Sequence, residues 1–182
     1  MLLTTPYYSQ FLDVKDPAWQ SRACGIACLK ILLEAEGTKT PSLDEMIKDG
    51  VALGAYGPSG WIHSGLIALA GKYGMKLARA EWRTTDIKTA YKLNKEGIAF
   101  LVSELRAGRP VIVSAIRRFK EADKFHMVVL VGFKGRGRGV DGFYYHDPDS
   151  RTRERGESQF VPIEIFRSTW RRMAISVKSK VE

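Results

Sequence analysis

Two cysteines lie one helical turn apart near the N-terminus, and one of them occupies a position that favours a nucleophile. Cys24 opens a segment whose apolar residues recur at helical spacing, whereas Cys28 falls one turn deeper in that segment. A thiol reacts as its thiolate, and its ordinary pKa of about 8.5 is lowered at a helix N-terminus and beside an imidazolium. The pattern predicts a reactive Cys24 and a Cys28 that only packs in the core. Packing is the commoner fate of free cysteines, so on this feature alone it stays an alternative for both.

His126 and Asp147 are candidates for the base and the carboxylate that a thiol nucleophile needs. His126 begins a run of core residues typical of a buried strand, and Asp147 ends a second such run just before Pro148. If the two strands are antiparallel neighbours, the start of one lies beside the end of the other. The carboxylate would then fix the imidazole tautomer and stabilise its cation. His146 precedes Asp147 in the same strand and is expected to point to the opposite face.

Three further residues are candidates for a substrate cleft. Gly25 follows Cys24 and would let a substrate backbone come close. Trp61 follows a glycine-rich loop over residues 54–60, and His63 comes two residues later. Large aromatic side chains lie more often in the core, so cleft and core remain alternative positions for Trp61.

Helical patterns fill the first half of the chain. Helical spacing covers residues 24–36 and 62–73, and Ser42 with Glu45 forms a capping box that opens a short helix between them. Thr84 or Thr85 can cap a helix that runs to about Asn94, and residues 98–107 predict a last short helix.

Strand patterns fill the second half. Buried-strand runs cover residues 110–116, 126–133, 142–147 and 170–178. The turns between them hold no long crossover helix, so the sheet is expected to be largely antiparallel. Helices followed by strands predict an α+β fold, and the length predicts a single domain over residues 1–182.

Composition and charge exclude several classes of protein. Hydrophobic residues make up 45% and charged residues 27% of the 182, as in ordinary globular proteins. No apolar run reaches the roughly 18 residues of a membrane span, and no signal peptide is visible. We therefore expect a cytoplasmic protein, although a chain already trimmed of its signal would look the same. The cysteines and histidines lack the spacing of a zinc site.

The net charge of +9 is concentrated in three arginine clusters. It predicts either an acidic partner, such as nucleic acid, an anionic membrane surface or an acidic peptide, or merely a solvated basic surface. No nucleic-acid-binding motif accompanies the charge. The clusters lie at residues 136–138, 151–155 and 171–172.

Taken in order, several blocks of this sequence resemble a known family. Gln10, A-C-G-I-A-C-L around Cys24, H-M-V-V-L-V-G-F from His126 and H-D-P at Asp147 are similar to the papain-like cysteine peptidases of the bacteriocin-leader (double-glycine) type. The likeness is greatest to their stand-alone relatives and runs from Pro6 to about Asp149. It implies a papain-like fold, with N-terminal helices packed on a C-terminal sheet.

The resemblance also assigns roles. It implies Cys24 as nucleophile, His126 as general base and acid, and Asp147 as the carboxylate that orients the histidine. An upstream glutamine of the family helps to hold the oxyanion; Gln10 fits the stand-alone relatives, and Gln20 is a second candidate. Ala23 stands where transporter-linked members often have aspartate, which weakens the case for double-glycine leaders as substrates.

The resemblance implies a thiol hydrolase that cleaves peptide or isopeptide bonds in a peptide or protein through a thioester. It needs no metal and no organic cofactor. An acyl transferase would show the same triad. The sequence is also compatible with a catalytically inactive peptide-binding module of the same fold, and with a basic nucleic-acid-binding domain.

Overall fold

The computed structural model describes residues 1–120, 124–136 and 139–178. Within these ranges six strands form one sheet in the order β3-β8-β4-β5-β6-β7, and all neighbouring pairs are antiparallel. This confirms the expected antiparallel sheet. The strands are β3 (Leu77–Glu81), β4 (Val111–Ile116), β5 (Phe125–Lys134), β6 (Gly142–His146), β7 (Gln159–Pro162) and β8 (Trp170–Val177).

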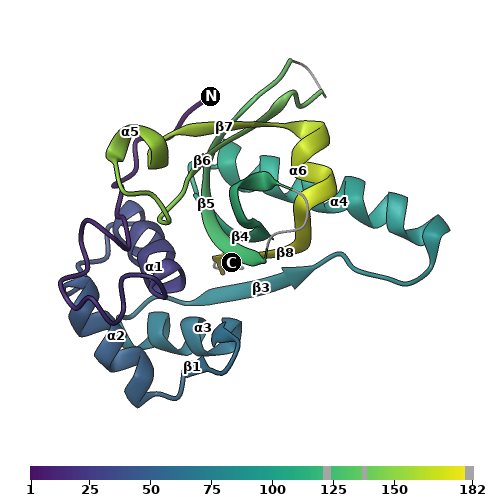
Figure 1. Ribbon diagram of the computed structural model, residues 1–182. Coiled ribbons are helices and arrows are strands. Elements are labelled where there is room, and N and C mark those ends of the chain that lie inside the picture. The colour runs from purple at the N-terminus through teal and green to yellow at the C-terminus, as the bar shows by residue number, and fades with distance from the viewer. Residues whose placement is uncertain (121–123, 137–138, 179–182) are drawn as a thin grey trace.

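Helices cover the sheet from two sides, with the N-terminal helices gathered beside α1 and the long α4 on the other side (Figure 1). Among the described residues the helices are α1 (Cys24–Ala35), α2 (Leu43–Ala52), α3 (His63–Lys72), α4 (Ile87–Arg106), α5 (Arg153–Gly156) and α6 (Ile163–Thr169). A short hairpin of β1 (Tyr56–Gly57) and β2 (Gly60–Trp61) precedes α3, and the 3₁₀ turn η1 (Arg117–Phe119) follows β4. None of the helices in the described ranges has the length and apolarity to span a bilayer.

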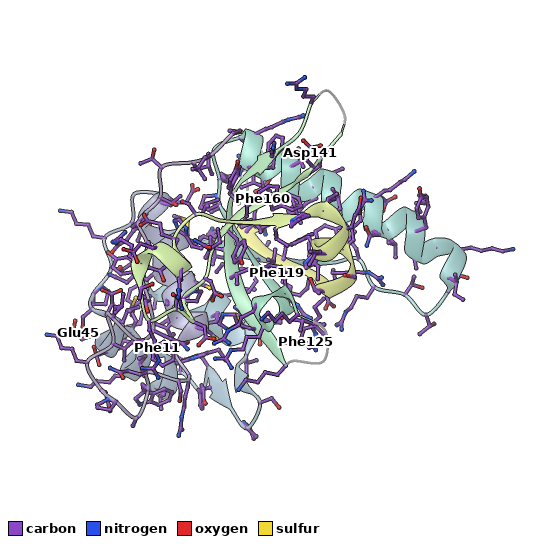
Figure 2. The ribbon with its side chains drawn as sticks, turned by 45° about the horizontal axis from the view of Figure 1, so that its top comes forward. Phe11, Glu45, Phe119, Phe125, Asp141 and Phe160 are labelled. Atoms are coloured by element: carbon purple, nitrogen blue, oxygen red, sulfur yellow. The ribbon has the colours of Figure 1, made fainter. Side chains whose placement is uncertain are left out.

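Alternation along β5 divides the apolar core into two layers. Met127, Val129 and Val131 pack with α1, α2 and α3, whereas Val128 and Leu130 pack with α4 and α6. Successive side chains of a strand point to opposite faces, so a nearly unbroken apolar run is what a strand covered on both faces requires. Phe119, at the end of η1, joins the second layer by packing its ring on Tyr145 and Phe166 (Figure 2).

The position of α1 is fixed by its packing against neighbouring elements. Most of α1 is buried, and it packs on β5. Gly37 follows its end with a φ of +80°, a left-handed conformation that glycine adopts without strain. The capping box of Ser42 and Glu45 is present at the start of α2, as predicted.

Two of the expected elements differ from the structure. The helices expected to end near Asn94 and to resume at 98 are one continuous helix, α4, and its N-cap is Asp86, not Thr84 or Thr85. Gly97 lies inside α4 without ending it, and glycine is needed there because a Cβ would lie 2.7 Å from the Trp170 ring. The edge strands β3 and β7 and the helices α5 and α6 were not predicted. Of the arginine cluster at 136–138, residues 137–138 lie outside the described residues.

Candidate active site

Cys24 lies at the first position of α1, partly exposed, whereas Cys28 is fully buried one turn below it. Burial raises the pKa of the Cys24 thiol, but the charge of His126, its ring hydrogen bond and backbone groups of Met127 and Gly25 lower that pKa more strongly. The net pKa of Cys24 therefore lies below that of an ordinary cysteine. Burial raises the pKa of Cys28 well above its ordinary value. The pKa values of the two thiols are thus shifted in opposite directions.

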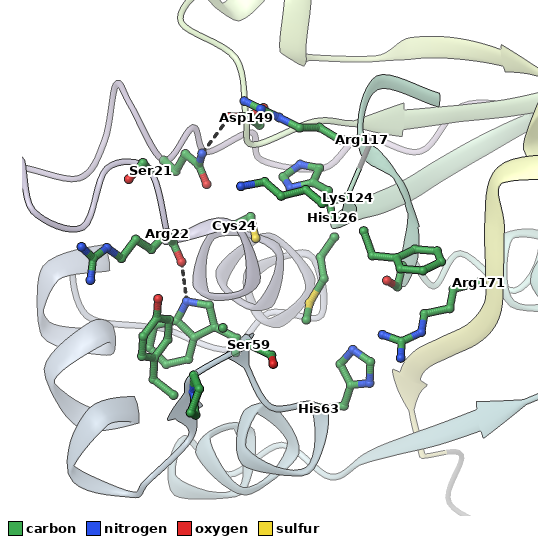
Figure 3. Close-up of a pocket in the computed structure, with 18 of the residues that line it drawn as sticks. Ser21, Arg22, Cys24, Ser59, His63, Arg117, Lys124, His126, Asp149 and Arg171 are labelled. Atoms are coloured by element: carbon green, nitrogen blue, oxygen red, sulfur yellow. Dashed lines mark hydrogen bonds and ion pairs between the residues drawn. The ribbon is translucent and has the colours of Figure 1, made fainter. Parts of the chain in front are cut away.

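His126 and Asp147 meet because β5 and β6 are antiparallel neighbours. The register pairs Val129 with His146, so the start of β5 lies beside the end of β6. The His126 Nε2 lies 2.8 Å from the Asp147 Oδ1, and both side chains are buried. Since Asp147 occupies Nε2, Nδ1 is the ring nitrogen left to face Cys24. Figure 3 shows the Cys24 sulfur beside the His126 ring.

The three groups shift one another's pKa values. Burial lowers the pKa of His126, but Cys24 and the hydrogen-bonded Asp147 outweigh it and raise the pKa to about 10. Burial raises the pKa of Asp147, but the hydrogen bond and charge of His126 bring it below its ordinary value. These directions all favour a thiolate beside an imidazolium, with an ionised carboxylate behind it.

Gln10 lies beside this trio, and Gln20 does not. The Gln10 Nε2 donates to the Asp149 Oδ1 at 2.9 Å, and its amide oxygen is buried without a partner among the described residues. Gln20 instead donates to the carbonyl of Val14 at 2.9 Å. The backbone N–H of Gln10 also donates to the Pro148 carbonyl at 2.9 Å, which ties its loop to the segment that carries Asp147.

Asp149 is a site residue that the sequence analysis missed. Its carboxylate accepts from Gln10 and pairs with the Arg117 Nε, and its backbone N–H donates to the Asp147 Oδ1 at 2.9 Å. It therefore links Gln10 to the Asp147 carboxylate. The available signal was the spacing D-P-D, which places a second acidic residue two positions after Asp147 in the same loop.

A cavity of about 600 Å³ opens in front of Cys24 and His126. Gln10 lines it, and so do Trp61 and His63, two of the three residues expected to line a substrate cleft (Figure 3). Trp61 is largely buried against Trp19 and Tyr56, and its ring N–H donates to the Arg22 carbonyl at 2.7 Å.

Gly25 does not line this cavity, which corrects the role expected for it. It is buried in α1 under the Trp61 side chain, and a Cβ at this position would lie 2.8 Å from the Trp61 Cβ. Glycine is therefore required here by the approach of Trp61 and not by the approach of a substrate.

His146 lies on the other face of β6, as expected. Its Nε2 lies 2.9 Å from the Thr5 hydroxyl, its Nδ1 accepts from the Ser158 N–H at 3.0 Å, and its ring packs on Tyr7. Within the described residues no three His, Cys, Asp or Glu side chains are grouped so that they could hold a metal ion.

Three of the solved structures that resemble this chain are described as peptidases or peptidase domains. A putative C39-like peptidase from Bacillus anthracis matches with a TM-score of 0.69 and 18% identity, over 100% of this chain and 98% of that one. A double glycine motif protease from an AMS/PCAT transporter, solved with its leader peptide, matches with a TM-score of 0.59 and 18% identity, over 97% and 94%. The peptidase domain of Streptococcus ComA matches with a TM-score of 0.59 and 20% identity, over 87% and 93%.

The fold is therefore that of the papain-like C39 peptidase domains. The chain belongs to the Peptidase_C39 like family, whose model matches residues 2–176. A comparison with curated proteins gave no match. Family and fold together support a peptidase function.

Proposed function

We propose that the chain is a thiol hydrolase that cleaves peptide or isopeptide bonds, with Cys24, His126 and Asp147 as its catalytic triad. One observation carries the proposal: the thiol of Cys24, a residue that lines the cavity, has a lowered pKa and contacts an imidazole, and a buried carboxylate lies 2.8 Å from that imidazole. A module that only bound peptides would have no use for a lowered thiol pKa, so this feature favours an enzyme.

The chemistry is an acyl transfer in two steps. The Cys24 thiolate attacks the carbonyl carbon, forms a C–S bond and pushes the carbonyl electron pair onto oxygen. As the tetrahedral intermediate collapses, the C–N bond breaks and the His126 imidazolium gives its proton to the departing nitrogen. Water, deprotonated by the now neutral His126, then attacks the thioester, which releases the acid and the thiolate. Asp147 stays ionised and stabilises the imidazolium throughout.

We propose two donors for the oxyanion. The N–H of Cys24 belongs to the first turn of α1, where N–H groups have no carbonyl partner within the helix. The Gln10 amide has two N–H groups, of which one donates to Asp149 and the second is left for a ligand. Losing one such donor typically slows the reaction by about 10²–10³. Of the two glutamines considered, the hydrogen bonds support Gln10 for this role.

The test compares two variants one turn apart on α1. A pool of synthetic peptides is incubated with each protein, and the products are identified by mass spectrometry. Cys24→Ala is expected to abolish cleavage and labelling by iodoacetamide, whereas Cys28→Ala, a matched control in the same helix, keeps both. Undiminished cleavage by Cys24→Ala would refute the proposal.

A further inference from the structure

Among the described residues that line the cavity in front of Cys24, positive charges outnumber negative charges. Arg22, Lys124 and Arg171 line it together with Arg117. Asp149 is the one carboxylate among the described residues of the lining, and it already accepts from Gln10 and pairs with Arg117. A charge excess in a concave site raises the local potential and favours an anionic ligand.

The cations lie on more than one side of the cavity. Arg22 lies on one side of Cys24, Arg171 beside His63 on the other, and Lys124 next to His126 (Figure 3). Each of the two arginines packs on an aromatic ring. The Arg171 guanidinium lies 5.0 Å from the Phe125 ring centre, and the Arg22 guanidinium lies 5.9 Å from the Trp19 ring centre. Within the described residues neither of these arginines has a carboxylate partner. Among the described residues, no carboxylate therefore neutralises these two charges.

The pKa of His63 is affected by the positive charge around the cavity. Burial lowers the pKa of this cavity residue, and the charges of Arg79, Arg171 and Arg83 lower it further, against the opposite effect of Glu81. The cavity wall thus disfavours an additional cation, and an anion at the same place would be favoured by the same charges.

The basic surface continues beyond the first cavity. A second groove of about 550 Å³ shares Phe11, Arg117 and Asp149 with it and is also lined by Arg118, Arg151 and Arg155. The Arg151 guanidinium lies 4.4 Å from the Phe11 ring centre, so an aromatic face holds this arginine as well. Among the described residues of the groove the carboxylates are Asp147, which pairs with His126, and Asp149, which pairs with Arg117. An extended chain that left the first cavity on this side would remain on a basic surface.

We infer that the substrate is a peptide segment with aspartate or glutamate residues close to the scissile bond. The inference rests on the proposed hydrolase function and names its substrate class. A polynucleotide would also be attracted by the positive charge, but its backbone contains no acyl carbon that the Cys24 thiolate could attack. The site chemistry therefore favours an acidic peptide.

The test measures cleavage of two peptide pools that differ only in carrying Glu or Lys at the randomised positions, with kcat/KM compared between pools. The wild type is expected to prefer the Glu pool. Arg171→Glu and Lys124→Glu, made separately, are each expected to lower kcat/KM for the Glu pool about fivefold or more and to raise it for the Lys pool, an effect that salt screens. Lys88→Glu, an equal change of charge on the exposed start of α4, is expected to leave the preference unchanged.

A binding arm separates this inference from the proposed function. Fluorescent peptides of both pools are titrated into Cys24→Ala, with single-stranded DNA as competitor. Tighter binding of the Glu pool without any cleavage by the wild type would refute the hydrolase and keep the acidic preference. Cleavage without preference for Glu, or DNA that binds more tightly than the Glu pool, would overturn the inference.

Discussion

Replacing Asp147 by asparagine removes one negative charge from the site while it keeps the size of the side chain. The lost interaction is a 2.8 Å hydrogen bond from the His126 imidazolium to a buried carboxylate. A charge-assisted bond of this kind contributes about 1.5–3 kcal/mol. At about 1.4 kcal/mol per factor of ten, we expect kcat/KM to fall on the order of 10- to 150-fold.

The same substitution should change the pH dependence in a defined direction. Asp147 raises the pKa of His126, so its loss lowers that pKa and weakens the stabilisation of the Cys24 thiolate. The acid limb of the rate profile is therefore expected to move to higher pH. The measurement is kcat/KM for peptide cleavage across the pH range, with the folded state checked by circular dichroism.

Asp141→Asn provides the matched control, because Asp141 is exposed and lies at the far end of the β5–β6 pair from Phe125 (Figure 2). This control should keep the wild-type rate. A folded Asp147→Asn variant whose kcat/KM stayed within about twofold of the wild type, with an unchanged pH profile, would show that the role given to Asp147 is wrong. Such a change is well below the loss expected for a charge-assisted hydrogen bond.

Three further outcomes follow from the same geometry. Gln10→Ala should lower kcat by about 10²–10³ while Gln20→Ala does not, and equal losses in both would contradict the choice of Gln10. Gly25→Ala should destabilise the fold by about 1–3 kcal/mol in urea unfolding, because its methyl group would lie 2.8 Å from the Trp61 Cβ; an unchanged midpoint would contradict this packing. The free energy of unfolding should fall between about pH 8.5 and about pH 10. In this range the unfolded chain has lost the protons of both Cys24 and His126, whereas the folded chain keeps the proton on His126. Between about pH 6.5 and about pH 8.5 each state holds one proton on the pair, so a fall that began near neutral pH would contradict the ion pair.

Local patterns were sufficient to predict the elements that carry the three residues of the proposed triad. The start of α1 follows from the spacing of its apolar residues, and β5 and β6 follow from two apolar runs with a short connection. Adjacent antiparallel strands then bring His126 to Asp147, and the pairing of β5 with β6 confirms that adjacency.

Features that depend on contacts between distant segments were not predictable in this way. Gly25 was assigned to the cleft because nothing near it in sequence indicates Trp61 above it. The choice between Gln10 and Gln20 depends on a loop held to Pro148, far along the chain. The polar edge strand β3 has only Leu77 buried and shows little strand pattern of its own.

The central claim is that Cys24 is a thiolate beside an imidazolium while the neighbouring Cys28 is an inert core thiol. The most direct measurement is the rate of iodoacetamide labelling of each cysteine as a function of pH, resolved by peptide mass spectrometry. Cys24 is predicted to react rapidly well below the ordinary thiol pKa of about 8.5, with Cys28 unlabelled in the folded protein. A Cys24 rate that rises only with an ordinary thiol titration, or equal labelling of the two cysteines, would contradict the account.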